Sequence, residues 1–168
     1  PLLVAENKSE LVGFRQLVDQ TSYIGEIGLD FSKEGKASKN EQISVMREIL
    51  TELRGKKKIV SAHSRKAEKV LFDLLCEYDI KNVIFHWYSG SVDLIPSILQ
   101  QGYYFSINEA MCRSKKGQSI IEYIPKDRVL TETDAPYNEE TDMREVLNLL
   151  KVSEQDVFIN FKRLLFGL

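Results

Sequence analysis

Residues 58–86 read KIVSAHSRKAEKVLFDLLCEYDIKNVIFH and contain one complete strand–helix–strand pattern. Apolar runs over 58–62 and 82–86 predict two buried strands, and the spacing of apolar residues over 66–78 predicts a helix between them. Such a helical crossover joins two parallel strands of one sheet. The only two histidines of the chain, His63 and His86, stand at the ends of these two strands. This stretch therefore predicts a parallel α/β fold with a histidine pair at one edge of the sheet.

The same alternation continues on both sides of this unit. The further predicted strands cover 23–27, 103–107 and 128–131, and the further predicted helices cover 9–20, 41–53, 92–101, 117–123, 143–150 and 154–165. About five strand–helix units in series imply a parallel sheet flanked by helices. In such folds the chemistry gathers at the carboxyl ends of the strands.

The composition is that of a soluble globular protein. With 168 residues, 43% of them hydrophobic and 29% charged, the chain is long enough for one domain with a substantial core. No apolar run approaches the roughly 20 residues that a membrane helix needs. Two cysteines are too few for a disulfide framework, so we expect a cytoplasmic protein. The net charge of −2 argues against a large positively charged surface that binds nucleic acid. A bound cation together with local basic residues can still bind phosphates.

Four predicted strand ends carry side chains that can bind a metal ion. These ends are the segments IGEIGLD (24–30), VSAHSR (60–65), FHWYSG (85–90) and LTETDAP (130–136). Imidazole and carboxylate ligands suit zinc, manganese and iron, and carboxylates also suit magnesium. We expect Glu26, His63, His86 and Asp134 to be the ligands. Glu26, with glycines on both sides, is suited to bridge two ions about 4 Å apart, and Asp134 is suited to bind an ion or the attacking water.

Each of these side chains also has an ordinary structural interpretation. Glycine-flanked glutamates occur in turns, strand-end histidines are often hydrogen-bonded core residues, and Glu132 and Asp134 can cap a following helix. Only their combination at one edge of a sheet favours a metal site. Arg65 can bind a substrate phosphate through its planar guanidinium or form a surface ion pair. We expect Ser89 to contact the substrate and Trp87 to pack in the core.

These segments resemble the signatures of the TatD family of metal-dependent deoxyribonucleases. The motifs GEIGLD (25–30), AHSR (62–65), HWYSG (86–90) and ETDAP (132–136) follow the family's order, within a resemblance that runs from residue 1 to about residue 163. A narrower resemblance, to TatD-like nucleases of Qat anti-phage systems, rests on HWYSGS (86–91) and FSINEAM (105–111).

The resemblance implies a TIM-type (β/α) barrel of the amidohydrolase kind that hydrolyses DNA phosphodiester bonds. It also implies a centre of two divalent ions, Mg, Mn or Zn. In that centre Glu26 bridges the ions, His63 and His86 bind one ion, and Asp134 binds the other. Glu132 is implied to support the site from outside the ligand set.

The chain departs from the family pattern at its start. Family members open with a His-x-His pair on the first strand, and this chain has no such pair. Residues 1–3 resemble the stretch after the family's third strand. We therefore expect residues 1–168 to form a single TatD-like domain without the first three strands, the carboxyl-terminal portion of a full barrel. A fragment, a barrel completed by a second copy or partner chain, and a non-catalytic relative are the competing explanations, and the first is preferred.

Three functions remain open from the sequence. The main hypothesis is a hydrolase that cleaves DNA with a metal-activated water, with Asp134 and Glu26 as catalytic residues. The second keeps the metal site but changes the substrate to a small amide, ester or phosphoester. The third is a non-catalytic metal-binding or structural subunit of a larger complex.

Overall fold

The five predicted strands form one parallel sheet in the computed structural model, which describes residues 9–135 and 141–167. The strands are β1 Tyr23–Gly28, β2 Ile59–His63, β3 Val83–His86, β4 Tyr104–Ile107 and β5 Val129–Thr131. Their spatial order is β1-β2-β3-β4-β5, the order of the sequence. Every crossover therefore steps to the next strand in the same direction, as in the wall of a TIM-type barrel, whereas a doubly wound sheet reverses its order. The sheet is an open arc of such a barrel, which confirms the predicted fold.

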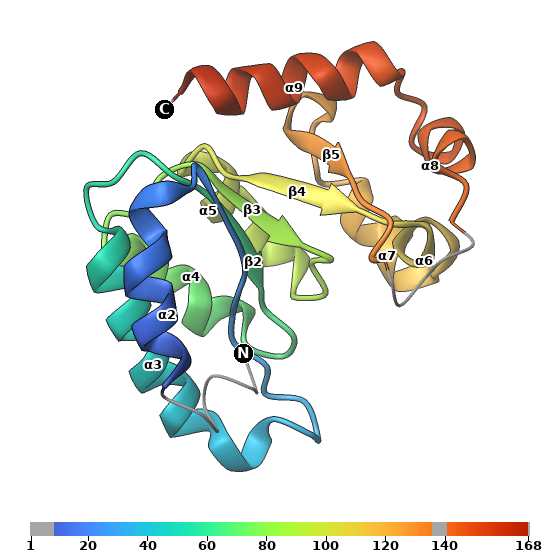
Figure 1. The fold of residues 1–168 in the computed structure, drawn as a ribbon. Helices are drawn as coiled ribbons and strands as arrows, with labels where there is room; N and C mark the ends of the chain where they lie inside the picture. The colour runs from blue at the N-terminus through green and yellow to red at the C-terminus, as the bar shows by residue number, and fades with distance from the viewer. Residues whose placement is uncertain (1–8, 136–140, 168) are drawn as a thin grey trace.

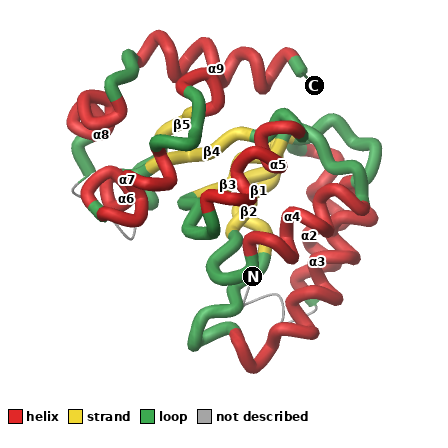
Figure 2. The backbone as a smooth tube through the Cα atoms, turned by 180° about the vertical axis from the view of Figure 1, so that it is seen from behind, coloured by secondary structure: helices red, strands yellow, loops and turns green. Residues whose placement is uncertain are grey.

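One face of the sheet is covered by helices, as Figures 1 and 2 show from opposite sides. Val60, Phe85 and Phe105 point to this face and are completely buried. They share one core with side chains from helices α2 Glu10–Leu17, α3 Lys39–Leu53, α4 Glu68–Glu77 and α5 Ile95–Gln100. Because side chains alternate between the two faces of a strand, the histidines that end β2 and β3 point to the opposite face.

On that opposite face, helix α9 (Glu154–Phe166) packs near the starts of the strands. Leu164 of this helix contacts a second apolar cluster, whose sheet residues are Ile59, Ile84, Tyr104 and Leu130. Asn160 fixes the helix to β5, since its amide nitrogen donates to the carbonyls of Lys126 (2.7 Å) and Val129 (2.8 Å).

The helix bounds agree with the sequence pattern except around residue 110. The helix expected over 117–123 is α7, Lys115–Ile121, and a further short helix that was not expected, α6 Glu109–Arg113, precedes it. Asn108 and Ser114 explain the difference, because each side chain accepts a hydrogen bond from a backbone N–H of the helix that follows it. Helix α8, Met143–Leu150, has the expected bounds.

None of the helices in the described ranges is long and apolar enough to cross a membrane.

Candidate metal centre

The pairing of β1, β2 and β3 brings one acidic and two imidazole side chains together. His63 lies directly opposite His86, and Gly28 lies opposite His63. Between Ile24 and Ile27, β1 spans one more residue than the paired part of β2, which is the pattern of a β-bulge. Such a bulge re-aims side chains, and here it contains Glu26. One carboxylate oxygen of Glu26 and one ring nitrogen of each histidine all lie within 4.8 Å of one another.

Glycine is needed on β1 because β2 approaches its backbone closely. Gly28 has a φ of +148°, and a Cβ atom placed there would lie 1.9 Å from the carbonyl oxygen of His63. At Gly25 a Cβ atom would lie 2.9 Å from the Cβ of Ser61. The glycines on both sides of Glu26 therefore permit the close approach that the sequence predicts.

Each histidine turns one nitrogen toward Glu26 and holds a carboxylate with the other. His63 Nδ1 lies 2.8 Å from Glu26 Oε1, and its Nε2 lies 3.3 Å from Asp30 Oδ2. His86 Nε2 lies 3.5 Å from Glu26 Oε2 and 3.3 Å from Asp134 Oδ1, whereas its Nδ1 lies 2.6 Å from Glu132 Oε2. Histidine ligands of metals are commonly oriented in this way by a carboxylate on the second nitrogen.

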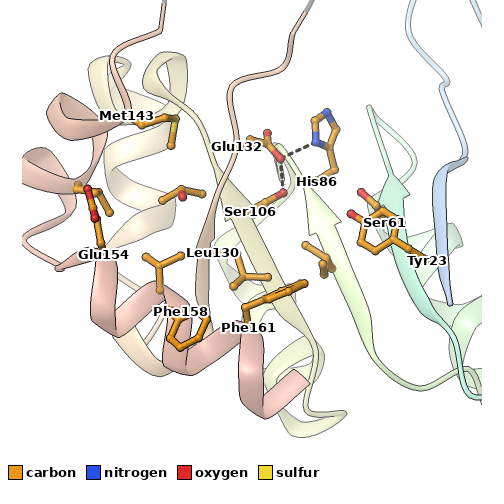
Figure 3. Close-up of a pocket in the computed structure, with 14 residues that line it drawn as sticks. Tyr23, Ser61, His86, Ser106, Leu130, Glu132, Met143, Glu154, Phe158 and Phe161 are labelled. Atoms are coloured by element: carbon orange, nitrogen blue, oxygen red, sulfur yellow. Dashed lines mark hydrogen bonds and ion pairs between the residues drawn. The ribbon is translucent and has the colours of Figure 1, made fainter. Parts of the chain in front are cut away.

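Glu132 is itself held by two further side chains, and Figure 3 shows the contacts of one of its oxygens. The Ser106 hydroxyl donates to Glu132 Oε2, the same oxygen that meets His86. Asn108 donates from Nδ2 to the other oxygen over 3.1 Å. Neither Ser106 nor Asp30 was singled out from the sequence. Asp30, which is buried, lies within the strand-end segment 24–30, so its place in that motif was the available signal.

The charges around the histidines affect the pKa values of the site. A hydrogen bond with His63 lowers the pKa of Glu26 against the opposing effect of burial. Burial disfavours the imidazolium of His86, but the hydrogen bond with Glu132 and the charges of Glu132, Glu26 and Asp134 outweigh it and raise the pKa. The carboxylates around His86 therefore favour a positive charge at this side chain. The two imidazoles of the site and its surrounding carboxylates fit a divalent cation, which would replace the proton.

The family model for TatD-related DNases matches residues 1–156 of the chain. The chain belongs to the TatD-related DNase family. Three of its relatives illustrate the range of the family. An uncharacterized metal-dependent hydrolase of Methanocaldococcus jannaschii is 30% identical over 143 residues, which cover 80% of this chain and 55% of the relative. The human deoxyribonuclease TATDN3 is 32% identical, over 70% of this chain and 44% of the relative. A 3'-5' ssDNA/RNA exonuclease TatD of Musicola paradisiaca is also 32% identical, with coverages of 75% and 50%. The chain thus spans about half the length of these curated relatives.

Solved structures of TatD proteins share the fold. The TatD homologue YJJV of Escherichia coli superposes with a TM-score of 0.78 at 22% identity, covering 97% of this chain and 80% of that one. A TatD family hydrolase of Entamoeba histolytica gives a TM-score of 0.75 at 19% identity, covering 94% and 67%. The resemblance to the TatD family that the motifs indicated is confirmed. The narrower resemblance to Qat nucleases and the roles of the single site residues stay predictions.

We call Glu26, His63 and His86 the ligand group. A cavity of about 470 Å³ opens beside this group in the TatD-related chain. Its lining includes two residues expected to contact substrate, Arg65 and Ser89. The Arg65 side chain is 58% exposed and forms only a loose ion pair with Glu34, at 3.8 Å. The Ser89 hydroxyl donates to Glu68 over 2.9 Å. Arg65 is therefore available to an anion in the cavity, whereas Ser89 is already hydrogen-bonded.

Trp87 also lines this cavity, and the expectation that it packs in the core is wrong. It is 42% exposed, whereas its neighbours Phe85 and Tyr88 are completely buried. The φ angle of Trp87 is +41°, a left-handed value that is uncommon for a large side chain. Asp134, which also lines the cavity, has a φ of +61°.

A second cavity, of about 610 Å³, lies on the same face of the sheet, toward α8 and α9. Figure 3 shows Phe158 and Phe161 of α9 on one side, with Leu130 and Ser61 of the sheet among the residues that face them. His86 lines both cavities. The ligand group therefore lies between a cavity lined mainly by polar and charged residues and one lined mainly by apolar residues.

Proposed function

We propose that this chain carries the metal centre of a hydrolase that cleaves DNA phosphodiester bonds. The observation that carries the proposal is the convergence of Glu26, His63 and His86 on one point beside an open cavity. Membership of the TatD-related DNase family supports DNA as the substrate. The human relative is named a deoxyribonuclease, and the Musicola paradisiaca relative is named an ssDNA/RNA exonuclease. The exposed guanidinium of Arg65 at the same cavity suits a phosphate group.

In this proposal Glu26, His63 and His86 hold one divalent ion, which is Mg, Mn or Zn. Glu26 and Asp134 would supply the carboxylate oxygens for a second ion. When bound, such ions lower the pKa of a water molecule and neutralise charge on the phosphate oxygens.

We propose the remaining roles from the positions of the side chains. Asp134 lies at the rim of the ligand group and takes the proton of the attacking water. Glu132 fixes the ring of His86 through its contact with Nδ1. Arg65 orients the scissile phosphate, and Ser89 contacts the neighbouring part of the DNA backbone by turning its hydroxyl from Glu68 to a phosphate oxygen.

The test is cleavage of end-labelled single-stranded DNA by the 168-residue chain with Mg²⁺ or Mn²⁺. Asp134→Asn keeps the size of the side chain but removes the base, so we expect the rate to fall by about 10²- to 10⁴-fold. The matched control is Asp127→Asn, which changes an exposed aspartate outside the site and is expected to leave the rate unchanged.

Two results would contradict the proposal. Undiminished cleavage by the Asp134→Asn variant would remove this residue from the mechanism. Hydrolysis of small phosphoesters, with no cleavage of DNA by the unaltered chain, would show that the substrate class is wrong.

A further inference from the structure

The end of β3 buries two aromatic side chains and exposes the one between them. Phe85 and Tyr88 pack edge to face, with ring centroids 5.9 Å apart, and Tyr88 packs in the same way on Phe105 at 5.5 Å. The Tyr88 hydroxyl donates to the carbonyl of Ser91 over 2.7 Å. This buried pair fixes the chain on both sides of Trp87. The indole is therefore presented to the cavity from a rigid support.

Nothing in the described part of the chain occupies the exposed surface of this indole. Trp87 makes no ring contact and no side-chain hydrogen bond with the described residues, although such contacts are frequent for this residue type. Glu26, His63 and Arg65 line the same cavity. A large aromatic surface thus lies next to the metal ligands and a free cationic side chain.

We propose that Trp87 is the platform on which an unpaired nucleobase next to the scissile phosphate stacks. The inference rests on the proposed function and names its substrate more closely. Stacking on an aromatic side chain accepts any base, because every base has a π-face. In a duplex both faces of an internal base are already covered by its neighbours. The site therefore takes single-stranded DNA, or the unpaired end of a duplex, without a strong sequence preference.

Trp87 is the only tryptophan of the chain, so its fluorescence reports on this position alone. The experiment titrates the Asp134→Asn variant, which keeps the DNA intact, with a thymidine oligonucleotide in Mg²⁺. A second titration uses an abasic oligonucleotide of the same length, which carries the same phosphates but no bases. We expect the thymidine oligonucleotide to quench the emission and the abasic one to bind without quenching. Equal emission changes with both, while anisotropy of labelled oligonucleotides shows binding, would overturn the proposal.

The KM of Trp87 variants that keep Asp134 gives a second, independent readout. Trp87→Ala is expected to raise KM for the thymidine oligonucleotide by roughly 5- to 100-fold, and Trp87→Phe to retain most of the affinity. The advantage of the base-containing over the abasic oligonucleotide should disappear in Trp87→Ala. Tyr123→Ala, which removes an exposed aromatic ring outside both cavities, is the control.

An unchanged KM in Trp87→Ala overturns the stacking role but leaves the proposed function intact. Failure of the unaltered chain to cleave any DNA overturns the function itself.

Discussion

Glu132 is the side chain on which the orientation of His86 depends most directly. It accepts hydrogen bonds from Ser106 and Asn108 and contacts Nδ1 of His86 at 2.6 Å. This contact leaves Nε2 facing Glu26 and Asp134. A carboxylate in this position also makes the ring nitrogen that faces the ligand group a stronger electron donor.

Glu132→Gln keeps the size and shape of the side chain but removes the negative charge beside His86. We expect the affinity for Zn²⁺ or Mn²⁺ to fall by about 10- to 100-fold, because the amide neither fixes nor polarises the imidazole as the carboxylate does. Isothermal titration calorimetry on the metal-free protein measures this change. Glu122→Gln, at an exposed position, is the control and should bind as the unaltered chain does. Equal affinities for the two variants would mean that Glu132 has no part in metal binding.

The sequence predicts which side chains meet at the ends of the strands better than it predicts their surroundings. Glu26, His63, His86 and Asp134 could be found because each follows an apolar run, and parallel strands bring such ends together. Trp87 was misjudged because its direction depends on a positive φ angle that local composition does not predict. The contact of Ser106 with Glu132 joins residues that are 26 positions apart, so no local pattern reveals it.

At the scale of the elements, the close pairing of β1 with β2 determines where Glu26 lies. Gly28 contributes twice to this pairing, through its φ of +148° and through the absence of a Cβ near the carbonyl of His63. The bulge just before it gives Glu26 its direction.

Gly28→Ala is therefore expected to separate the two strands and to destabilise the fold by at least about 3 kcal/mol. For a chain of this length that corresponds to a Tm lower by roughly 6 °C or more, measured by circular dichroism. Gly13→Ala is the matched control, since it lies inside α2 with nothing within 4 Å of its Cβ position. Alanine should stabilise the helix there by about 0.5–1 kcal/mol. Similar Tm values for the two variants would contradict the account of β1.

Strands and helices were predictable wherever a single periodicity covers the whole element. Helix α3 and strands β2 and β3 follow from apolar spacing alone, with bounds that differ by a residue or two from those predicted. Helix α6 did not follow, and α7 begins two residues before the predicted start, because the starts of these short helices depend on capping by Asn108 and Ser114 and not on periodicity.

At the scale of the whole molecule, the candidate site connects segments that are far apart in the sequence. Glu26 and Asp134 are separated by most of the chain, and the sheet alone brings them to the same edge. A ligand that binds this assembled group, and not the unfolded chain, stabilises the entire fold. The expectation that a further segment or partner chain completes the barrel stays a prediction.

A divalent ion should therefore raise the Tm of the chain. At a free concentration of 100 times Kd the expected stabilisation is about 2.7 kcal/mol, or roughly 5–10 °C. Removal of the ion with EDTA should reverse it. The Glu26→Gln variant should show little metal-dependent shift in differential scanning calorimetry. An equal shift in this variant would place the ion elsewhere on the protein.

The most direct test of the metal centre is the anomalous scattering of a crystal of this chain soaked with Zn²⁺. We expect a peak between Glu26, His63 and His86, about 2.0–2.2 Å from one oxygen and two nitrogen atoms. A second peak beside Asp134 would indicate the second ion. No peak at these side chains, while the ion binds at another position, would contradict a metal centre formed by Glu26, His63 and His86.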